Sequence, residues 1–147
     1  MLKAVIDTSV FCAALKSKTK TSITAKILKA WLSGCFTLIM APLLLEELAR
    51  KLYEIGVPEQ DVEDLILNIL DVAENIPGVY EATRLDDIDP DDNMFIAAAY
   101  ESKADYIVSR DNHLLNLKHS HGTQIVDPPL FLRVLTTRQT LSSKDFG

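Results

Sequence analysis

The stretch DDIDPDDNMFIAAAYESKADYIVSRD, residues 86–111, joins an acidic run, an apolar helix pattern and an apolar strand pattern. Five carboxylates fall within residues 86–92, and an alanine-rich apolar run follows them directly. Acidic residues are favoured at helix starts, so this pattern predicts a helix from about Asp91 to Ser102. Residues 104–111 are apolar in the middle and end in an acid, which predicts a buried strand.

The same alternation of short apolar strands and helices continues outward in both directions. Strands are expected at 3–7, 35–40 and 123–127, with a further short one at 79–83, and helices at 22–33, 42–55, 59–76, 112–117 and 128–135. Strands that are apolar on both faces and alternate with helices are typical of a parallel sheet covered on both sides. The sequence therefore predicts an α/β fold, a three-layer α/β/α sandwich.

The length of 147 residues fits one domain with a sizeable core. The domain is expected to cover residues 1–135. The tail from 136 to 147 is polar and lacks periodicity, so it is expected to be mobile.

The composition restricts the possible functions. The formal net charge of −6 argues against a dedicated duplex-DNA binder. A local strip, residues 16–29, nevertheless holds five lysines and no acid. Such a run is usually a solvated face, and contact with nucleic acid is the alternative, with Lys16, Lys18 and Lys20 as the candidates.

Cellular location can also be inferred from composition. No apolar run approaches the roughly 18 residues that a membrane span requires. Cys12 and Cys35 are the only cysteines, and both lie in apolar segments. We interpret them as two reduced thiols of a cytoplasmic protein.

Four acids that are distant in sequence are expected to meet at one edge of the sheet. Asp7 ends the first predicted strand and Asp111 ends the strand YIVSR. The helix carrying Glu47 follows the second strand, and the helix beginning near Asp92 starts at or near the same edge. The carboxyl ends of parallel strands share one edge, and ligands bind in the crevice there.

Carboxylates brought this close would repel one another unless a cation compensated them. A set of oxygen ligands without His or Cys favours Mg²⁺ or Mn²⁺ over zinc. Such an ion can polarise a phosphodiester and activate water. The sequence therefore predicts a magnesium or manganese site formed by Asp7, Glu47, Asp92 and Asp111.

Each of these residues also has a simpler interpretation. Asp7 and Asp111 are good helix or turn caps, and one acid near the helix start at 91 is explained by capping alone. Glu47 can pair with Lys51 one turn later on a solvated surface. The joint pattern, not any single position, favours the metal site.

Three segments carry a family resemblance: VIDTSVF at 5–11, EELARKL at 46–52 and DPDDNMFIAAAYESKADYIVSRDNHLL at 89–115. With these, the chain resembles PIN-domain proteins over about residues 1–135. More narrowly, it resembles the toxin components of toxin–antitoxin pairs related to VapC-type ribonucleases. The resemblance implies a Rossmann-like central parallel sheet, three or four acids that hold Mg²⁺ or Mn²⁺, and hydrolysis of RNA.

Transferred residue by residue, the family's first acid falls on Asp7, the helix glutamate on Glu47 and the last acid on Asp111. The third acid is ambiguous between Asp92 and Asn93, and Asp92 is the favoured ligand.

Four residues are expected to support the acids. Ser109 matches the Ser or Thr that usually precedes the last acid. The family often has Asn where Ser9 stands, which leaves an amide contact there open. Thr8 and Asn93 complete the supporting set.

The favoured hypothesis is a metal-dependent endoribonuclease that acts on RNA. A toxin role would imply a cognate antitoxin, and the family resemblance implies a homodimer. A PIN-like module that binds RNA or protein without cutting is the alternative. A phosphotransfer or phosphatase domain is less favoured, because Ser9 stands where a second Asp would be needed and TQIVDPP, 123–129, lacks a lysine.

Overall fold

A six-stranded sheet forms the centre of the molecule. The computed structural model describes residues 1–17, 19, 21–79 and 93–146. The strands lie in the order β3-β2-β1-β4-β6-β5, and all neighbours are parallel except β5 and β6. They are β1 Lys3–Ile6, β2 Thr37–Met40, β3 Glu74–Asn75, β4 Tyr106–Val108, β5 His119–Ser120 and β6 Thr123–Val126.

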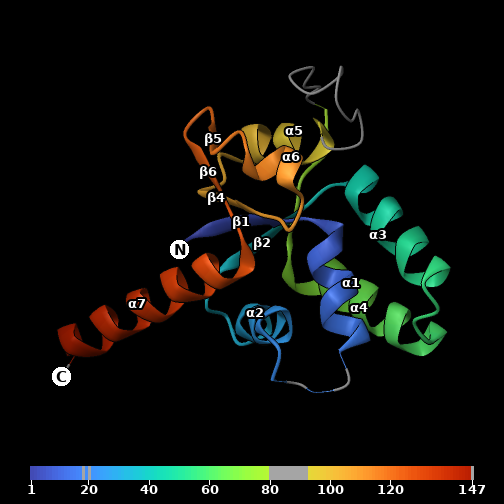
Figure 1. Ribbon diagram of the computed structural model, residues 1–147, viewed down its shortest axis with the longest axis horizontal. Helices are drawn as coiled ribbons and strands as arrows, with labels where there is room; N and C mark the ends of the chain where they lie inside the picture. Colours follow the sequence, from blue (N-terminus) through green and yellow to red (C-terminus); the bar gives the residue numbers. More distant parts are fainter. Residues whose placement is uncertain (18, 20, 80–92, 147) are drawn as a thin grey trace.

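Helices cover both faces of this sheet. They are α1 Thr8–Lys16, α2 Ile23–Leu32, α3 Pro42–Glu54, α4 Glu59–Val72, α5 Asn93–Ser102, α6 Asn112–Leu115 and α7 Pro128–Phe146. In Figure 1, α5 and α6 lie above the strands, and α1, α2, α4 and α7 lie below them. The predicted fold class, a three-layer α/β/α sandwich around a mostly parallel sheet, is confirmed.

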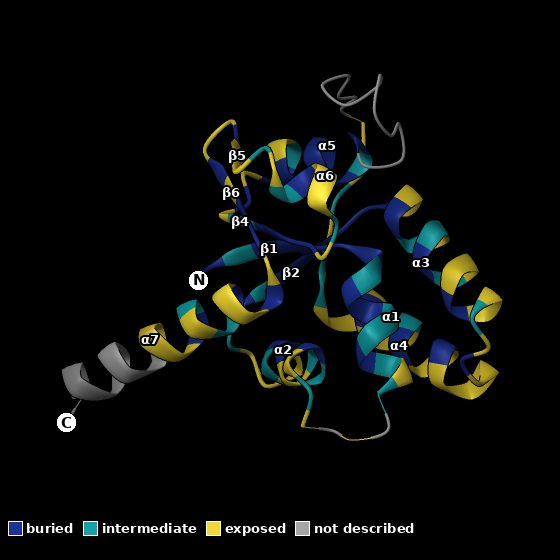
Figure 2. Cartoon of the chain, in the orientation of Figure 1, coloured by how far each residue is buried: buried dark blue, intermediate teal, exposed yellow. Residues whose placement is uncertain are grey.

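The core follows the middle of the sheet. Val5 on β1 pairs with Ile39 on β2 and with Ile107 on β4, and all three side chains are fully buried. Figure 2 shows the central strands in the buried colour and the outer faces of the helices in the exposed colour. β-branched side chains pack well on a pleated surface buried on both sides, which explains why these short segments form strands.

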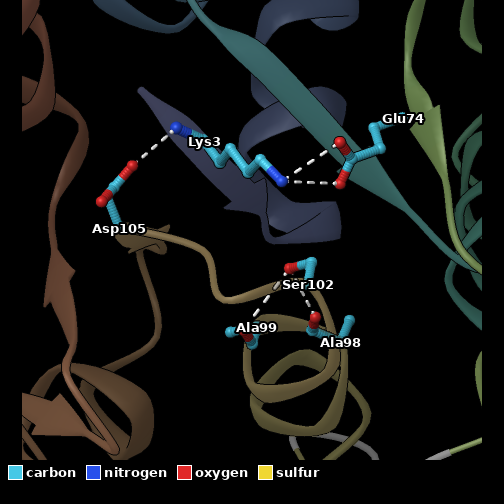
Figure 3. A network of polar contacts seen from close by, with 6 residues as sticks. All are labelled: Lys3, Glu74, Ala98, Ala99, Ser102 and Asp105. Atoms are coloured by element: carbon cyan, nitrogen blue, oxygen red, sulfur yellow. Dashed lines mark hydrogen bonds and ion pairs between the residues drawn. The ribbon is translucent and has the colours of Figure 1, made fainter. Parts of the chain in front are cut away.

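The amino-terminal edge of the sheet is fastened by structural polar contacts (Figure 3). The main-chain N–H of Lys3 donates to Asp105 Oδ2 at 2.8 Å, and Lys3 Nζ lies 3.2 Å from Glu74 Oε1. Nearby, Ser102 Oγ donates to the carbonyl of Ala98 at 2.8 Å within α5. The carboxylates at this edge are paired with Lys3 and hold β1, β3 and β4 together. They therefore have a structural role, and the candidate acids lie at the other edge.

Several elements differ from the sequence-based expectation. Helix α1 is not predicted, because its first turn, Thr8 to Phe11, is rich in hydroxyl and β-branched residues of low helix propensity. It forms because Asp7 caps it and because Val10, Phe11 and Ala14 are buried. The two-residue strands β3 and β5 are also not predicted, since they are too short to show periodicity. Most of the expected strand at 79–83 lies outside the described residues.

Helix α7 continues well past residue 135, where no element is predicted. Phe131 and Leu135 are buried, whereas residues 136–138 are exposed. Periodicity reports a buried face, so the exposed residues 136–138 give no such signal. The division of the chain at 135 stays a prediction.

Two smaller expectations can be compared with the structure. Cys12 and Cys35 are not joined by a disulfide. In the part of the chain that the structure describes, no helix is both long and apolar enough to cross a membrane.

Candidate metal centre

The candidate centre lies where the connections from two neighbouring strands diverge. Strand β1 lies between β2 and β4. After β1 the chain continues through α1 and α2 to β2, and after β4 it continues through α6 to β5 and β6. In doubly wound sheets this switch point opens the crevice in which ligands bind. Asp7 follows β1 directly, and Ser109 follows β4 directly.

Asp7 is held in one orientation by short hydrogen bonds. Its main-chain N–H donates to the carbonyl of Val108 at 2.9 Å, which extends the β1–β4 pairing by one residue. Its Oδ1 accepts the N–H of Ser9 at 3.4 Å, as a helix cap does, and its Oδ2 accepts Ser9 Oγ at 3.2 Å. The side chain is 6% exposed. A buried carboxylate is therefore fixed at the end of the central strand.

Ser109 connects Asp7 to Asp111. Its fully buried hydroxyl donates to Asp7 Oδ2 at 2.6 Å and accepts the main-chain N–H of Asp111 at 2.9 Å. Asp111, which is partly buried, in turn accepts the N–H of His113 at 2.8 Å and caps α6. The structure thus brings Asp7, Ser109 and Asp111 together, and both aspartates also perform the capping role considered as the simpler interpretation.

The environment makes the charged form of Asp7 costly. Burial raises the pKa of the Asp7 carboxyl above its usual range, and the negative charge of Asp111 raises it slightly further. Hydrogen bonds from Ser109 and Ser9 oppose this shift in pKa without cancelling it. Desolvation and a like charge disfavour ionisation, whereas donors to the carboxylate favour it. A cation beside Asp7 would remove this cost.

Glu47 reaches the same region through Thr8. The hydroxyl of Thr8 donates to Glu47 Oε2 at 3.1 Å, which places the first turn of α1 against the second turn of α3. Burial raises the pKa of the Cys12 thiol, and the negative charges of Asp7 and Glu47 raise it further. Both carboxylates are therefore close enough to α1 to act on the same side chain.

The remaining predicted residues are placed only in part. Asn93 is the first residue of α5 and is 4% exposed. Asp92, the favoured third ligand, lies outside the described residues. Among the residues that are described, no group of three or more His, Cys, Asp or Glu side chains is arranged to hold a metal ion. The four-acid set therefore stays a prediction.

Of the three predicted RNA-binding lysines, one lies away from this centre and two lie outside the described residues. Lys16 is exposed at the far end of α1 from Asp7, and a helix of this length rises about 13 Å. Its Nζ approaches Gly56, which follows α3. Lys18 and Lys20 lie outside the described residues, so the role of this strip stays a prediction.

Sequence comparison adds independent evidence of ancestry. Residues 3–113 match the sequence model of a PIN-domain family, a span that includes Asp7, Glu47 and Asp111. The chain belongs to the PIN-domain family. A search of curated proteins finds no match.

Two solved structures share the fold of this PIN domain. One is the VapBC2 complex from Rickettsia felis bound to a DNA fragment from its promoter, with 15% identity and a TM-score of 0.58 over 86% of this chain and 98% of that chain. The other is VapC20 from Mycobacterium tuberculosis, a toxin that cleaves the sarcin–ricin loop. It has 15% identity and a TM-score of 0.58 over 82% of this chain and 98% of that chain. At this identity the likeness establishes the fold alone.

The sequence does not show how this PIN domain links its acids. Thr8 and Ser109 are predicted supporting residues, but their partners, Glu47 for Thr8 and Asp7 for Ser109, become visible only in three dimensions. Arg110, which stands between Ser109 and Asp111, is not among the predicted residues. Its position at the carboxyl end of a strand, beside a candidate ligand, is the signal that the sequence offers.

Proposed function

We propose that this PIN domain is a metal-dependent endoribonuclease that hydrolyses RNA. The observation that carries the proposal is the buried, hydrogen-bonded Asp7 at the switch point of the sheet, joined through Ser109 to Asp111. A buried carboxylate beside another acid costs stability, so its presence at the switch point, where sheets of this kind bind ligands, is better explained by function than by packing.

The residues at the centre fit a hard divalent cation. Asp7, Asp111 and Glu47 supply carboxylate oxygens, which suit Mg²⁺ or Mn²⁺. The raised pKa of Asp7 identifies a carboxylate that a positive charge would stabilise. Asp92 would complete the set. When bound, the ion supplies Lewis-acid stabilisation of the negative charge that develops on the phosphodiester.

The chain's own residues have separable roles in this proposal. Asp7, Asp92 and Asp111 hold the cation, and Glu47 binds it or orients the attacking water. Ser109 fixes the position of Asp7, and Thr8 fixes that of Glu47, each by one hydrogen bond. Groups whose orientation is set before the substrate arrives lose little free energy in reorganising during the reaction.

The toxin role extends this proposal to a partner. The structural similarity to VapC20 and to the toxin–antitoxin complex VapBC2 supports a cognate antitoxin for this chain. We include a homodimer in the proposal because the sequence resemblance implies one. Co-expression of the neighbouring open reading frame, followed by co-purification, would test the antitoxin.

One observation favours the alternative of a PIN-like module that binds RNA or protein without cutting. The described residues contain no three-ligand metal cluster, although Asp92 is not among them. Metal-dependent turnover separates the two functions, because a silent module binds without producing fragments.

The decisive experiment measures cleavage of labelled single-stranded RNA with Mg²⁺, with Mn²⁺ and with EDTA. The variants Asp7→Asn and Asp111→Asn keep an acceptor for the helix cap, so a lost activity reports the charge and not the cap. Asp71→Asn, at an exposed position on α4, is the matched control. We expect metal-dependent cleavage that both centre variants abolish and the control retains. Cleavage that persists in EDTA or in Asp7→Asn would refute the proposal.

A further inference from the structure

A groove of about 530 Å³ opens beside the candidate centre, on the β4–β6 side. Its walls come from the end of α1, the start of α2, the second residue after β4, helix α6 and the β6–α7 junction. The lining residues used below are Ile23, Arg110, Leu115, Asp127 and Pro129. The groove therefore lies along the carboxyl edge of the sheet, not on the edge fastened by Lys3.

Arg110 is the lining residue of the groove that stands next to the centre in the chain. It stands in the chain between Ser109, which holds Asp7, and Asp111. Its side chain is exposed, and within the described part of the chain it forms no ion pair or hydrogen bond. A guanidinium presents several donors in a planar fork that matches phosphate oxygens. Among the described residues that line the groove, Arg110 is the one that offers a phosphate a positive charge.

The other end of the groove has the opposite character. Asp127 follows β6 and caps α7, since its Oδ1 accepts the N–H of Leu130 at 3.0 Å. A carboxylate repels phosphate, but it accepts hydrogen bonds from the amino groups of bases. Leu115 and Pro129 supply apolar surface along the wall. Charge therefore orients an occupant with its phosphate at Arg110 and its base toward Asp127.

We propose that this groove is a nucleotide subsite of the nuclease. Arg110 binds the phosphate adjacent to the one that is cleaved, and the attached base lies along the apolar wall. Asp127 discriminates among bases by accepting an amino group, which cytosine, adenine and guanine carry and uracil lacks. This inference rests on the proposed function, because it assigns part of the RNA to a named place beside the same centre.

Binding measured in EDTA tests the subsite separately from catalysis. Fluorescein-labelled single-stranded RNA is titrated with Arg110→Gln and with wild type, and affinity is followed by anisotropy over a range of salt concentrations. The matched control is Arg138→Gln, because Arg138 lines a pocket with Met1 and Asp105 at the opposite edge. We expect Arg110→Gln to raise the Kd about five- to tenfold. The slope of log K against log salt should fall by about 0.7, the value for one lost phosphate contact on a single strand.

The base preference is tested with oligo-C and oligo-U of equal length. We expect wild type to bind oligo-C more tightly than oligo-U. Asp127→Asn should reduce this difference in affinity, because an amide offers uracil a donor as well as an acceptor. Asn is also a good helix cap, so the start of α7 is retained. Thermal unfolding of each variant establishes that it is folded.

The outcomes distinguish this proposal from the broader one. Equal loss of affinity in Arg110→Gln and Arg138→Gln would overturn the subsite, because general charge alone would explain it. Unchanged RNA affinity in Arg110→Gln would also overturn it and would leave the groove to a protein partner. An unchanged C-over-U difference in Asp127→Asn would refute the assigned base contact. Each result stands whether or not the protein cleaves RNA, whereas failure of metal-dependent cleavage would count against the nuclease itself.

Discussion

The substitution Asp7→Asn should change stability in opposite directions with and without metal. Asn keeps the shape and the oxygen that caps α1, but its amide nitrogen stands where Oδ2 accepts the hydroxyls of Ser109 and Ser9, and it removes a charge from a residue that is 6% exposed. Because the folded-state pKa of Asp7 lies above the usual value of 3.8, the folded protein binds more protons than the unfolded chain across the interval between the two pKa values. Stability therefore falls as pH rises through that interval, and the loss is complete above the folded-state pKa.

The structure sets the size of the metal-free effect. Oδ2 of Asp7 accepts two hydrogen bonds, from Ser109 and Ser9, and each contributes about 1 kcal/mol that is lost when an amide nitrogen takes the place of this oxygen. The cost of burying the carboxylate is several kcal/mol, and the raised pKa indicates that burial outweighs the donors. We expect Asp7→Asn to be more stable than wild type in EDTA at pH 7 by on the order of 1 kcal/mol. That gain corresponds to a rise in Tm of about 2–4 °C.

Bound metal should make wild type more stable than Asp7→Asn, the reverse of their order in EDTA. At 100 times its Kd, a cation that binds only the folded protein adds about 2.7 kcal/mol of stability. For a chain of this length the gain corresponds to a rise in Tm of about 5–10 °C. Asp7→Asn loses a charged ligand, so it should show little of this rise.

The assay is thermal unfolding followed by circular dichroism, at pH 7 and at pH 4, in EDTA and in excess Mn²⁺. Asp71→Asn serves as the control for removing an exposed aspartate. A lower stability of Asp7→Asn than of wild type in EDTA would contradict the cost assigned to burying the carboxylate. Equal stabilisation of the variant and wild type by Mn²⁺ would contradict the role of Asp7 as a ligand.

Two further predictions concern the hydroxyls that position the acids. Ser109→Ala should lower the free energy of unfolding by about 1–3 kcal/mol. It should also weaken Mn²⁺ binding about 10–100-fold, because Asp7 loses the buried hydroxyl that donates to it. Denaturant unfolding and Mn²⁺ titration measure the two effects, and Ser102→Ala, which breaks only a neutral bond inside α5, should leave Mn²⁺ binding unchanged. Thr8→Val removes the single hydrogen bond from Thr8 to Glu47, so it should reduce Mn²⁺-dependent RNA cleavage and lower stability by about 1 kcal/mol. Cleavage equal to that of wild type would show that this contact is only structural.

The fold could be predicted where a segment is buried in a regular way. The strands around Val5, Ile39 and Ile107 read as apolar runs because both of their faces are covered. Helix α1 could not be predicted, because tertiary burial of Val10 and Phe11 overrides the low helix propensity of their neighbours. The continuation of α7 past residue 135 could not be predicted for the opposite reason: residues 136–138 are exposed and give no period.

The residues of the candidate centre could be predicted from the sequence, but the hydrogen bonds that join them could not. Strand ends locate Asp7 and Asp111 at one edge from topology alone. Sequence spacing does not tell which oxygen of Asp7 accepts the hydrogen bond from Ser109. It also does not tell that Thr8 on α1 donates a hydrogen bond to Glu47 on α3. Those contacts depend on rotamers and on helix packing, which are fixed only when the whole core assembles.

Capping and metal binding are alternative explanations of the aspartates in the sequence, but in this geometry one supports the other. Asp7 uses Oδ1 to cap α1, and Asp111 uses Oδ1 to cap α6. A carboxylate has two oxygens with about four acceptor positions, so a cap leaves room for a cation. The cap fixes the side chain's rotamer before the ion arrives, which lowers the entropy cost of binding. A helix that begins directly after a central parallel strand therefore places a carboxylate at the crevice and also holds it in the orientation that the proposed chemistry requires.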